Sequence, residues 1–436
     1  MAESDTIFAL ATPPGRSALA VFRISGAQAG YVLEMLSGRA VPEARRVVLR
    51  AISDPDSGER IDTGLATFFK GPASFTGEDL LELTVHGGRG VINAVSSILR
   101  RFEKVRTAEP GEFTRRAYSA GKFDLAQAEA IADLIDSETE FQRRQALRLL
   151  DNGLGRRAEV WRQSLLQIAV ELESVLDFSD EGDVGEAQVE GLVARAEELR
   201  LEIVRALDAG ARSLALRNGF TVVIAGPPNV GKSTLFNLLA GSELAIVTEY
   251  AGTTRDLLST DLDLDGVPVK LVDTAGVRVA LDPVEAIGVE RARSAIGSAD
   301  LVVRLQSGDV DPFDEAAPGD LVVWSKADRF APPKGVIAIS SVDFDSISKL
   351  IKSIRERALN TVGDGSEGLL TRQRHLDALA ISADALGRLI EASRGNRLEL
   401  AAEECRDVNV ALGSISGSFG AEELLGAIFA RFCIGK

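Results

Sequence analysis

The stretch "FTVVIAGPPNVGKST" (220–234) constrains the fold more than any other part of the chain. Its apolar first half predicts a buried strand, and the glycine-rich turn that follows opens a predicted helix. Gly226, Gly231, Lys232 and Ser233 satisfy the phosphate-loop pattern G-x-x-x-x-G-K-[ST]. In such a loop backbone N–H groups approach phosphate oxygens, the lysine reaches the β- and γ-phosphates, and the serine holds Mg²⁺. The chain is therefore predicted to contain an α/β nucleotide-binding domain.

The segment "LVDTAG" (271–276) supplies the groups expected on the far side of the phosphates. It follows the strand-like run "VPVKLV", so its polar residues lie where a strand ends. Asp273 is placed to contact Mg²⁺ through water, and the N–H of Gly276 is placed to sense the γ-phosphate.

The segments "SKAD" (325–328) and "AISS" (338–341) indicate which base is bound. Asp328 can accept the two N–H groups on the edge of guanine, a donor pair that adenine lacks. GTPases usually carry Asn where this chain has Ser325. Because a serine is shorter and spans fewer contacts, we expect weaker nucleotide affinity. Taken together, these segments predict a GTPase.

The residue after "DTAG" is Val277, which cannot orient the attacking water as a glutamine does in Ras-type enzymes. No arginine finger is evident either, although such a residue is worth ~10³–10⁵ in rate. A monovalent cation, held by Asn229 and oxygens of "TEYAGTTRD" (248–256), is one candidate for the missing charge. Glu285 is the nearest carboxylate that could orient water, but a solvated helix residue is the simpler interpretation of Glu285 by itself.

The spacing of apolar residues along the chain changes three times. Short apolar runs and turns predict an α+β domain over residues 1–120, and helical spacing follows over 121–214 with a break at Asn152–Gly153. Residues 215–370 alternate strands and helices, and residues 371–436 are helical again. The simplest architecture is an α/β domain inserted into a helical domain. Two separate helical domains remain the alternative.

Bulk properties limit the setting of the protein. The net charge of −16 argues against a broad nucleic-acid-binding surface. With two cysteines there is no disulfide framework, and no run of 18 apolar residues or basic leader is present, so a cytoplasmic location is predicted. Cys433 in the terminal "CIGK" has three possible roles: lipidation, which Lys436 disfavours, a small core residue, or a reactive thiol.

At this point the sequence resembles the tRNA-modification GTPase family MnmE, also called TrmE. The resemblance runs over the whole chain through eight motifs in the family's order. These are "VFRISG", "PGEFTRRA", "GKFDLAQAEA", "PNVGKSTL", "AGTTRD", "DTAG", "IGVERA" and the terminal "CIGK".

The resemblance implies an N-terminal folate-binding α/β domain, a helical domain, and an inserted Ras-like GTPase domain. It implies addition of a carboxymethylaminomethyl or aminomethyl group to carbon 5 of the wobble uridine in certain tRNAs. It further implies a homodimer that works with the FAD-dependent partner MnmG (GidA). A tetrahydrofolate derivative would supply the one-carbon unit, and K⁺ would accelerate GTP hydrolysis.

The resemblance also assigns site residues. Glu285 falls at the water-orienting position and Cys433 in the reactive terminal motif. Mg²⁺ falls to Ser233 and Thr254, K⁺ to Asn229, Thr248, Tyr250 and Thr253, and folate to Arg23, Glu82, Lys122 and Lys436. Motifs and resemblance together predict a GTP-binding set of Gly226, Asn229, Val230, Gly231, Lys232, Ser233, Thr234, Thr248, Glu249, Tyr250, Ala251, Gly252, Thr253, Thr254, Asp273, Thr274, Ala275, Gly276, Ser325, Lys326, Asp328, Ser340 and Ser341.

Some polar residues have two interpretations. We expect His86 to be structural rather than catalytic, and the arginine pairs at 115–116, 143–144 and 156–157 contact either tRNA phosphates or solvent. The chief functional rival is a GTP-switched assembly factor, acting for example on ribosomes, that has no use for Cys433 or the folate residues. A folate-binding regulatory module would leave the GTPase motifs unexplained.

Overall fold

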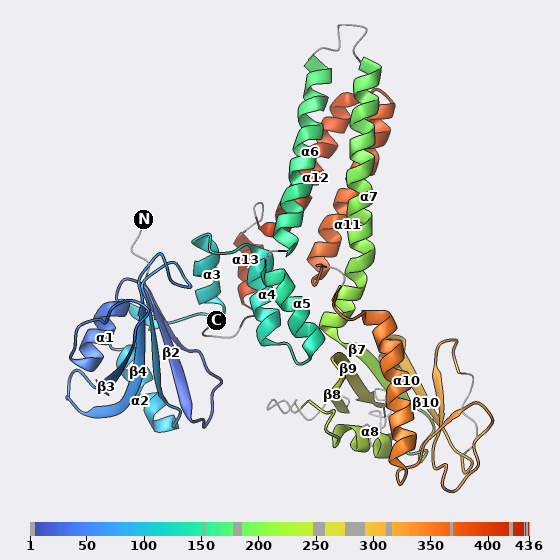
Figure 1. Cartoon of the computed structure of the whole chain (residues 1–436), viewed down its shortest axis with the longest axis horizontal. Helices are drawn as coiled ribbons and strands as arrows, with labels where there is room; N and C mark the ends of the chain where they lie inside the picture. The colour runs from blue at the N-terminus through green and yellow to red at the C-terminus, as the bar shows by residue number, and fades with distance from the viewer. Residues whose placement is uncertain are drawn as a thin grey trace, which may run out of the picture. The chain divides into compact units, whose positions relative to one another are not determined.

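The computed structural model describes residues 5–151, 153–177, 185–246, 258–274, 293–310, 316–366, 369–417, 422–430, 432 and 435. The chain divides into two compact units, the first formed by residues 1–132 together with 416–436 and the second by residues 133–415. The described residues of each unit contain one six-stranded sheet (Figure 1). The four domain ranges given above stay predictions.

The sheet of the first unit is mostly antiparallel, with strand order β3-β4-β5-β2-β1-β6 and a parallel β1–β6 pair. Its central strand β2 is in register with β5 from Leu19↔His86 to Ser25↔Leu80. The strands are β1 (Thr6–Leu10), β2 (Leu19–Ser25), β3 (Val47–Ser53), β4 (Arg60–Phe69), β5 (Leu80–His86) and β6 (Val105–Thr107).

Helices α1 (Ala29–Ser37) and α2 (Arg89–Leu99) pack against this sheet. Helix α1 places Val32, Leu33 and Leu36 at the spacing of one helical face, and all three are fully buried in a core with Phe22 of β2. The alternation of buried and accessible residues along β2 follows from the two-residue period of a strand. The predicted α/β character of the N-terminal region is confirmed.

The C-terminal residues complete the first unit. Helix α3 (Glu112–Ser119), helix α4 (Leu125–Ile135) and helix α13 (Glu422–Phe429) share an apolar cluster centred on Leu125, Ala128 and Phe429. Leu425, Ile428 and Phe432, on one face of the C-terminal segment, pack against that cluster. Burial of this face docks the end of the chain.

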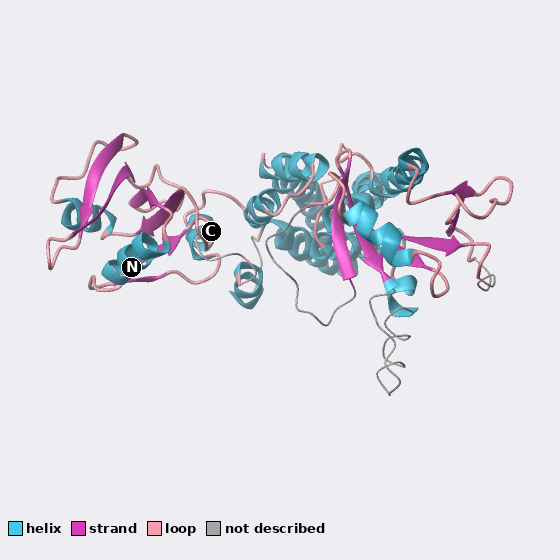
Figure 2. Ribbon diagram, turned by 90° about the horizontal axis from the view of Figure 1, so that it is seen from below, coloured by secondary structure: helices cyan, strands magenta, loops and turns pink. Residues whose placement is uncertain are grey.

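The second unit contains a bundle of long helices that run side by side in Figure 1 and are seen nearly end-on in Figure 2. Each buries one stripe, for example Trp161, Leu165, Ile168 and Leu172 along one of them. None of the described helices is long and apolar enough to cross a membrane. The bundle helices are α6 (Gly153–Asp177), α7 (Gly185–Asn218), α11 (Gln373–Arg394) and α12 (Leu398–Ser416), and the shorter α5 (Glu140–Leu150) contacts α6 and α7.

The second sheet lies between α7 and α11 along the chain, whereas α7 and α11 themselves pack together. An α/β domain is therefore inserted into a helical one, as predicted. The strand order is β12-β11-β10-β7-β9-β8, parallel except for β8 against β9. Its elements are β7 (Phe220–Ala225), α8 (Lys232–Ala240), β8 (Leu258–Leu264), β9 (Val267–Asp273), β10 (Leu301–Gln306), β11 (Leu321–Trp324), β12 (Ile337–Ala338) and α10 (Phe344–Val362).

Candidate functional site

The loop between β7 and α8 has the backbone that a phosphate-binding loop requires. Gly226 has φ +149°, and a Cβ there would lie 2.6 Å from the carbonyl oxygen of Leu305. Asn229 and Gly231 also have positive φ, +64° and +106°. Val230 between them is fully buried in the core of the sheet. The glycines therefore allow the tight turn, and Val230 anchors it.

Lys232 and Ser233 begin helix α8 at the mouth of this loop. The ammonium of Lys232 donates to the carbonyls of Gly226 at 2.8 Å and Pro227 at 2.9 Å. Burial lowers the pKa of Lys232, and the neighbouring Asp273 carboxylate partly opposes this shift. The lysine is thus held over the loop, where a phosphate chain would meet it together with the N-terminus of α8.

Ser233 and Asp273 come together from α8 and the end of β9. The Ser233 hydroxyl donates to Oδ2 of Asp273 at 3.0 Å, and the Asp273 side chain is fully buried. A hydroxyl and a carboxylate are hard oxygen ligands of the kind Mg²⁺ takes beside phosphates, so these residues fit Mg²⁺. Thr274, next in the chain, donates to the carbonyl of Ile224 at 2.8 Å and ties β9 to β7.

The base-recognition segments lie beside the same loop. A cavity of about 220 Å³ is lined by Gly231 and Thr234 of the loop and helix, and by Ser325, Lys326, Asp328 and Ser341 of the segments after β11 and β12. Ser340 donates to Oδ1 of Asp328 at 2.8 Å, which orients the carboxylate. The structure therefore brings together the described members of the predicted GTP-binding set.

Ser325 reaches the phosphate loop directly. Its hydroxyl lies 2.6 Å from the carbonyl oxygen of Val230 and 3.1 Å from that of Gln306. A hydroxyl has one proton and satisfies one of these acceptors at a time, whereas an amide NH₂ carries two. The connection between the base-recognition segment and the phosphate loop is present, and the expectation of weaker nucleotide binding stays a prediction.

Sequence reasoning missed Asp309, which holds Lys326. Lys326 has φ +52° and donates from Nζ to the carbonyl of Asn229 and to Oδ2 of Asp309, both at 2.7 Å. The hydrogen bond from Lys326 lowers the pKa of Asp309. Only the position of Asp309 soon after a parallel strand could have marked it in the sequence.

Several predicted residues lie outside the described part of the chain. Leu258 and Asp273 pair in register where β8 begins and β9 ends, and these residues border the segments 247–257 and 275–292. Outside the described residues are Thr248, Glu249, Tyr250, Ala251, Gly252, Thr253, Thr254, Ala275, Gly276, Glu285, Cys433 and Lys436.

The predicted folate residues of the first unit are partly assembled. Arg23 of β2 and Glu82 of β5 are register partners, with Arg23 Nε 3.0 Å from Glu82 Oε1 and both side chains 30% exposed. The Arg23 guanidinium also lies 5.5 Å from the ring centre of Phe75, whose ring is 5.7 Å from that of Phe123. Lys122, beside Phe123, donates to the carbonyl of Pro72. Phe75 was not anticipated from the sequence.

A carboxylate, an aromatic ring and cations suit a folate, because a pterin presents a donor edge and a flat face. Gly435 is the described residue of the terminal "CIGK". Gly435 is buried at φ +97°, and a Cβ there would lie 2.6 Å from the carbonyl oxygen of Leu10. Leu10 follows Ala9, the register partner of Arg23. Gly435 therefore lies against Leu10, one residue along β1 from the register partner of Arg23.

His86 and most of the paired arginines have partners within the protein. His86 Nδ1 lies 2.8 Å from Asp62 Oδ1, and the His86 backbone N–H donates to the other oxygen. Burial favours a higher pKa for Asp62, but these hydrogen bonds outweigh it and hold the pKa below its usual value. Arg143 and Arg144 both pair with Glu140 on their own helix. A role of these arginines in tRNA binding stays a prediction.

Comparison with known proteins agrees with the motifs. The model of the GTP-binding protein TrmE N-terminus matches residues 6–122, and that of the MnmE helical domain matches residues 125–433. The tRNA modification GTPase MnmE of Beijerinckia indica subsp. indica is 46% identical over 99% of this chain and 96% of its own. That of Methylobacterium sp. (strain 4-46) is 47% identical over 99% and 100%.

Among solved structures, the G domain of the T. maritima FeoB iron transporter matches 32% of this chain and 98% of its own, at 24% identity and a TM-score of 0.25. The full-length relatives carry the conclusion. With near-complete coverage at 46–47% identity and two family models that together span residues 6–433, the chain belongs to the tRNA modification GTPase MnmE family.

Proposed function

We propose that this chain hydrolyses GTP and uses the hydrolysis in modifying carbon 5 of the wobble uridine of tRNA. The observation that carries the proposal is the convergence of three groups around one loop. These are the Lys232 ammonium, the Ser233–Asp273 pair and the Asp328 carboxylate held by Ser340. The first two meet phosphates and Mg²⁺, and the third accepts the donor edge of guanine.

Two further groups complete the proposed hydrolysis site. Glu285 would orient the attacking water, since Val277 has no polar atom to do so. K⁺, held by Asn229, Thr248, Tyr250 and Thr253, would supply positive charge as the γ-phosphate leaves. Of these ligands Asn229 lies in the described loop, where its carbonyl accepts from Lys326.

The first unit would bind the one-carbon donor. Glu82 would accept from the pterin of a formyl- or methylene-tetrahydrofolate, and Arg23, Lys122 and Lys436 would meet its carboxylates. The register pair Arg23–Glu82 and the docked Gly435 support this placement. Cys433 would react at the same pocket. The FAD-dependent MnmG would be the partner in building the aminomethyl or carboxymethylaminomethyl group.

A second copy of the chain is proposed to cover the open face of the first sheet. Leu49 of β3 and Leu65 of β4 are register partners, and they are 65% and 44% exposed. An adjacent pair of exposed leucines on a sheet face is a feature of association surfaces. Light scattering on the purified chain, with Leu49→Asp as the comparison, tests the homodimer.

GTP hydrolysis by the purified full-length chain in KCl and in NaCl tests the first proposal. We expect a rate several-fold higher in K⁺, and ATP should be a poor substrate. Equal rates in the two salts would contradict the proposed role of K⁺ in hydrolysis. Equal hydrolysis of ATP and GTP would contradict the selection of guanine by Asp328. Wobble-uridine analysis of tRNA from cells lacking the protein then separates tRNA modification from an assembly role without chemistry.

A further inference from the structure

The chain passes between the helical bundle and the second sheet twice. The outgoing crossing, residues 217–219, joins α7 to β7, and the return crossing, residues 363–372, joins α10 to α11. The carboxylate of Asp133 accepts hydrogen bonds from side chains at both crossings. Oδ1 of Asp133 accepts from Arg217 Nε at 2.8 Å and from Arg372 Nη2 at 2.7 Å, and the Asp133 side chain is only 10% exposed.

Helix α5 also forms hydrogen bonds to both connections, the one from α7 to β7 and the one from α10 to α11. Figure 1 shows α5 beside the point where α7 leads into β7. The Gln142 side chain donates to the carbonyl of Arg217 at 3.2 Å, and the buried Gln145 donates to that of Ser213 at 2.9 Å. Arg148, one turn further, donates to the carbonyl of Gly365 in the return crossing. Asp133 and α5 therefore bind both connections independently of each other.

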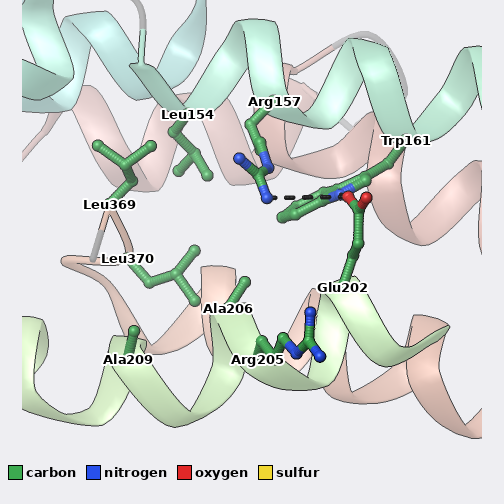
Figure 3. Close-up of a pocket in the computed structure, with 9 residues that line it drawn as sticks. All are labelled: Leu154, Arg157, Trp161, Glu202, Arg205, Ala206, Ala209, Leu369 and Leu370. Carbon is green, nitrogen blue, oxygen red and sulfur yellow. Dashed lines mark hydrogen bonds and ion pairs between the residues drawn. The ribbon is translucent and has the colours of Figure 1, made fainter. Parts of the chain in front are cut away.

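The return crossing has room beside it. Leu369 and Leu370 pack where α6 and α7 carry Gly153 and Gly210, and a Cβ at either glycine would lie within 2.8 Å of a leucine methyl. A cavity of about 340 Å³ adjoins both leucines (Figure 3). Trp161 and the Arg157–Glu202 pair form its opposite side. An apolar segment next to free volume can shift without meeting packed atoms.

Phe141 of α5 connects this region to the second sheet. Its ring packs on the core of that sheet. It also lies against Gly266 in the turn between β8 and β9, where a Cβ would be 2.9 Å from the ring. Arg355 of α10 holds the same turn, with Nε 3.2 Å from the Leu264 carbonyl and 3.2 Å from an Asp265 oxygen. The turn at Gly266 is therefore in contact with α5 through Phe141 and with α10 through Arg355.

The far end of the β8–β9 hairpin is the nucleotide site. Leu258 pairs with Asp273, whose carboxylate is hydrogen-bonded to Ser233. Strands of this length span roughly 20 Å at about 3.3 Å per residue. The two strands are paired from Leu258↔Asp273 to Leu264↔Val267, so one continuous ladder joins Asp273 to the turn at Gly266.

We propose that Phe141 and Asp133 are positioning residues through which the β8–β9 hairpin moves the helical bundle when the bound nucleotide changes. The proposal rests on the GTPase function proposed above. Phe141 receives the movement of the turn, and Asp133 passes it to the ends of α7 and α11 through Arg217 and Arg372. Neither residue lines the cavity beside the phosphate loop.

Distance measurements by pulsed electron spin resonance test this joint on the full chain. Spin labels are placed at the exposed Gln167 of α6 and Lys349 of α10, with Cys405 and Cys433 replaced by serine. We expect the distance distribution to differ between GDP and GDP with aluminium fluoride. In Phe141→Ala this difference should disappear, while GTP hydrolysis stays within about two-fold.

In the cysteine-containing protein, Phe141→Ala should lower tRNA modification about ten-fold. Phe141→Leu keeps an apolar contact and should retain the nucleotide-dependent shift. Glu140→Gln is the matched control, since Glu140 lies on the same helix and, among the residues that the structure describes, forms its ion pairs with Arg143 and Arg144 of that helix. Asp133→Asn, nearly equal in shape, gives the same test if Phe141→Ala fails to fold, and it should also abolish the shift.

An unchanged shift in a folded Phe141→Ala or Asp133→Asn protein overturns the proposal. No shift in the unsubstituted protein overturns it as well. Failure of the underlying function is distinguishable, because a chain that is not a GTPase would show no GTP hydrolysis in any variant, whatever its distances.

Discussion

The nucleotide site and the Arg23–Glu82 region are both groups of charges at strands, but they are assembled differently. In the nucleotide site Lys232 bonds to carbonyls of its own loop, five and six residues away. In the first unit Arg23 and Glu82 are 59 residues apart and meet only because β2 and β5 pair in register. The phosphate loop of the first site is local in sequence, whereas the Arg23–Glu82 pair depends on the sheet.

The first unit contains another ion-pair network whose members come from different elements, unlike the charges of the phosphate loop. Glu112, 2% exposed, accepts from Arg106 and from Arg116, at 2.7 Å and 2.9 Å. Arg116 also pairs with Glu78, and Glu78 accepts from the Ser25 hydroxyl of β2. Structural charges and the charges proposed to bind folate are therefore interleaved in the first unit, whereas the charges of the phosphate loop are arranged by one turn of chain.

The largest expected effect separates the two regions. Cys433→Ser should abolish wobble-uridine modification while GTP hydrolysis and the fold stay unchanged, because the thiolate is the reactive form of cysteine and serine cannot replace it. Mass spectrometry of tRNA nucleosides measures the first and phosphate release the second. Cys405→Ser is the control, since burial raises the pKa of Cys405 to about 11 and keeps it an inert thiol. A normal level of wobble-uridine modification in Cys433→Ser would show that Cys433 is not reactive in this step and would favour its alternative role as a small core residue.

The converse substitution acts at the nucleotide site. Glu285→Ala should lower kcat for GTP by ~10²–10⁴, the contribution of a positioned proton-transfer group, and leave GTP affinity within about two-fold. Single-turnover hydrolysis and calorimetry measure the two quantities. A fall in affinity equal to the fall in rate would show that Glu285 is structural, and the separation from Cys433 would then break down.

The third prediction concerns the stability of the first unit. Burial favours a higher pKa for Glu112, but hydrogen bonds from Arg106, the Glu109 backbone and Arg116 lower the pKa to about 2. Its folded pKa lies below the unfolded value, so its stabilisation is fully present above pH 4.5 and is lost as pH falls towards 2. Glu112→Gln removes the buried carboxylate that Arg106 and Arg116 share, and should destabilise the unit by about 3 kcal/mol at neutral pH.

Thermal unfolding of the wild type and Glu112→Gln at pH 7 and pH 3 measures this difference. The gap between the two proteins should narrow at the lower pH. Glu140→Gln serves as the control, because the Glu140 pairs are exposed and surface pairs contribute little. An equal gap at both pH values would mean that the glutamine disturbs packing rather than charge.

The smallest effect is expected at Ser325. Ser325→Asn should tighten GDP and GTP binding several-fold, because an amide can donate to the carbonyls of Val230 and Gln306 together. Isothermal calorimetry against both nucleotides detects a change of this size. If the affinity does not rise, the single Ser325 hydroxyl is sufficient to join the base-recognition segment to the phosphate loop, and serine in place of the usual asparagine does not weaken nucleotide binding.

The sequence predicted the nucleotide site more completely than the first-unit site for a physical reason. A phosphate loop is fixed by spacing alone, since glycines at 226 and 231 and the helix start at Lys232 determine where the N–H groups point. The strand, the loop and the roles of Lys232, Ser233 and Asp328 could therefore be inferred from residues close together. The apolar stripe of α11 also follows from local spacing, since Leu379, Ala383, Leu386 and Ile390 are buried at steps of three and four residues and Leu376 of the same stripe is half-buried.

Phe75 and Asp309 had no such signal. Phe75 meets Arg23 because a loop after β4 folds back over β2, and Asp309 meets Lys326 because β10 and β11 end side by side. Contacts of this kind depend on strand order and register. A single sequence does not encode these explicitly, because many pairings bury similar apolar area.

The sequence by itself determined the periodicities, the inserted α/β order and the motifs of a GTPase, since each of these rests on neighbours within about ten residues. The tertiary structure decided which distant side chains meet: Arg23 with Glu82, Asp133 with Arg217 and Arg372, and Phe141 with the turn at Gly266. The reason is that a hydrogen bond or ring contact acts over a few ångströms, and only the packed sheets and helices bring residues 59 to 239 positions apart within that range.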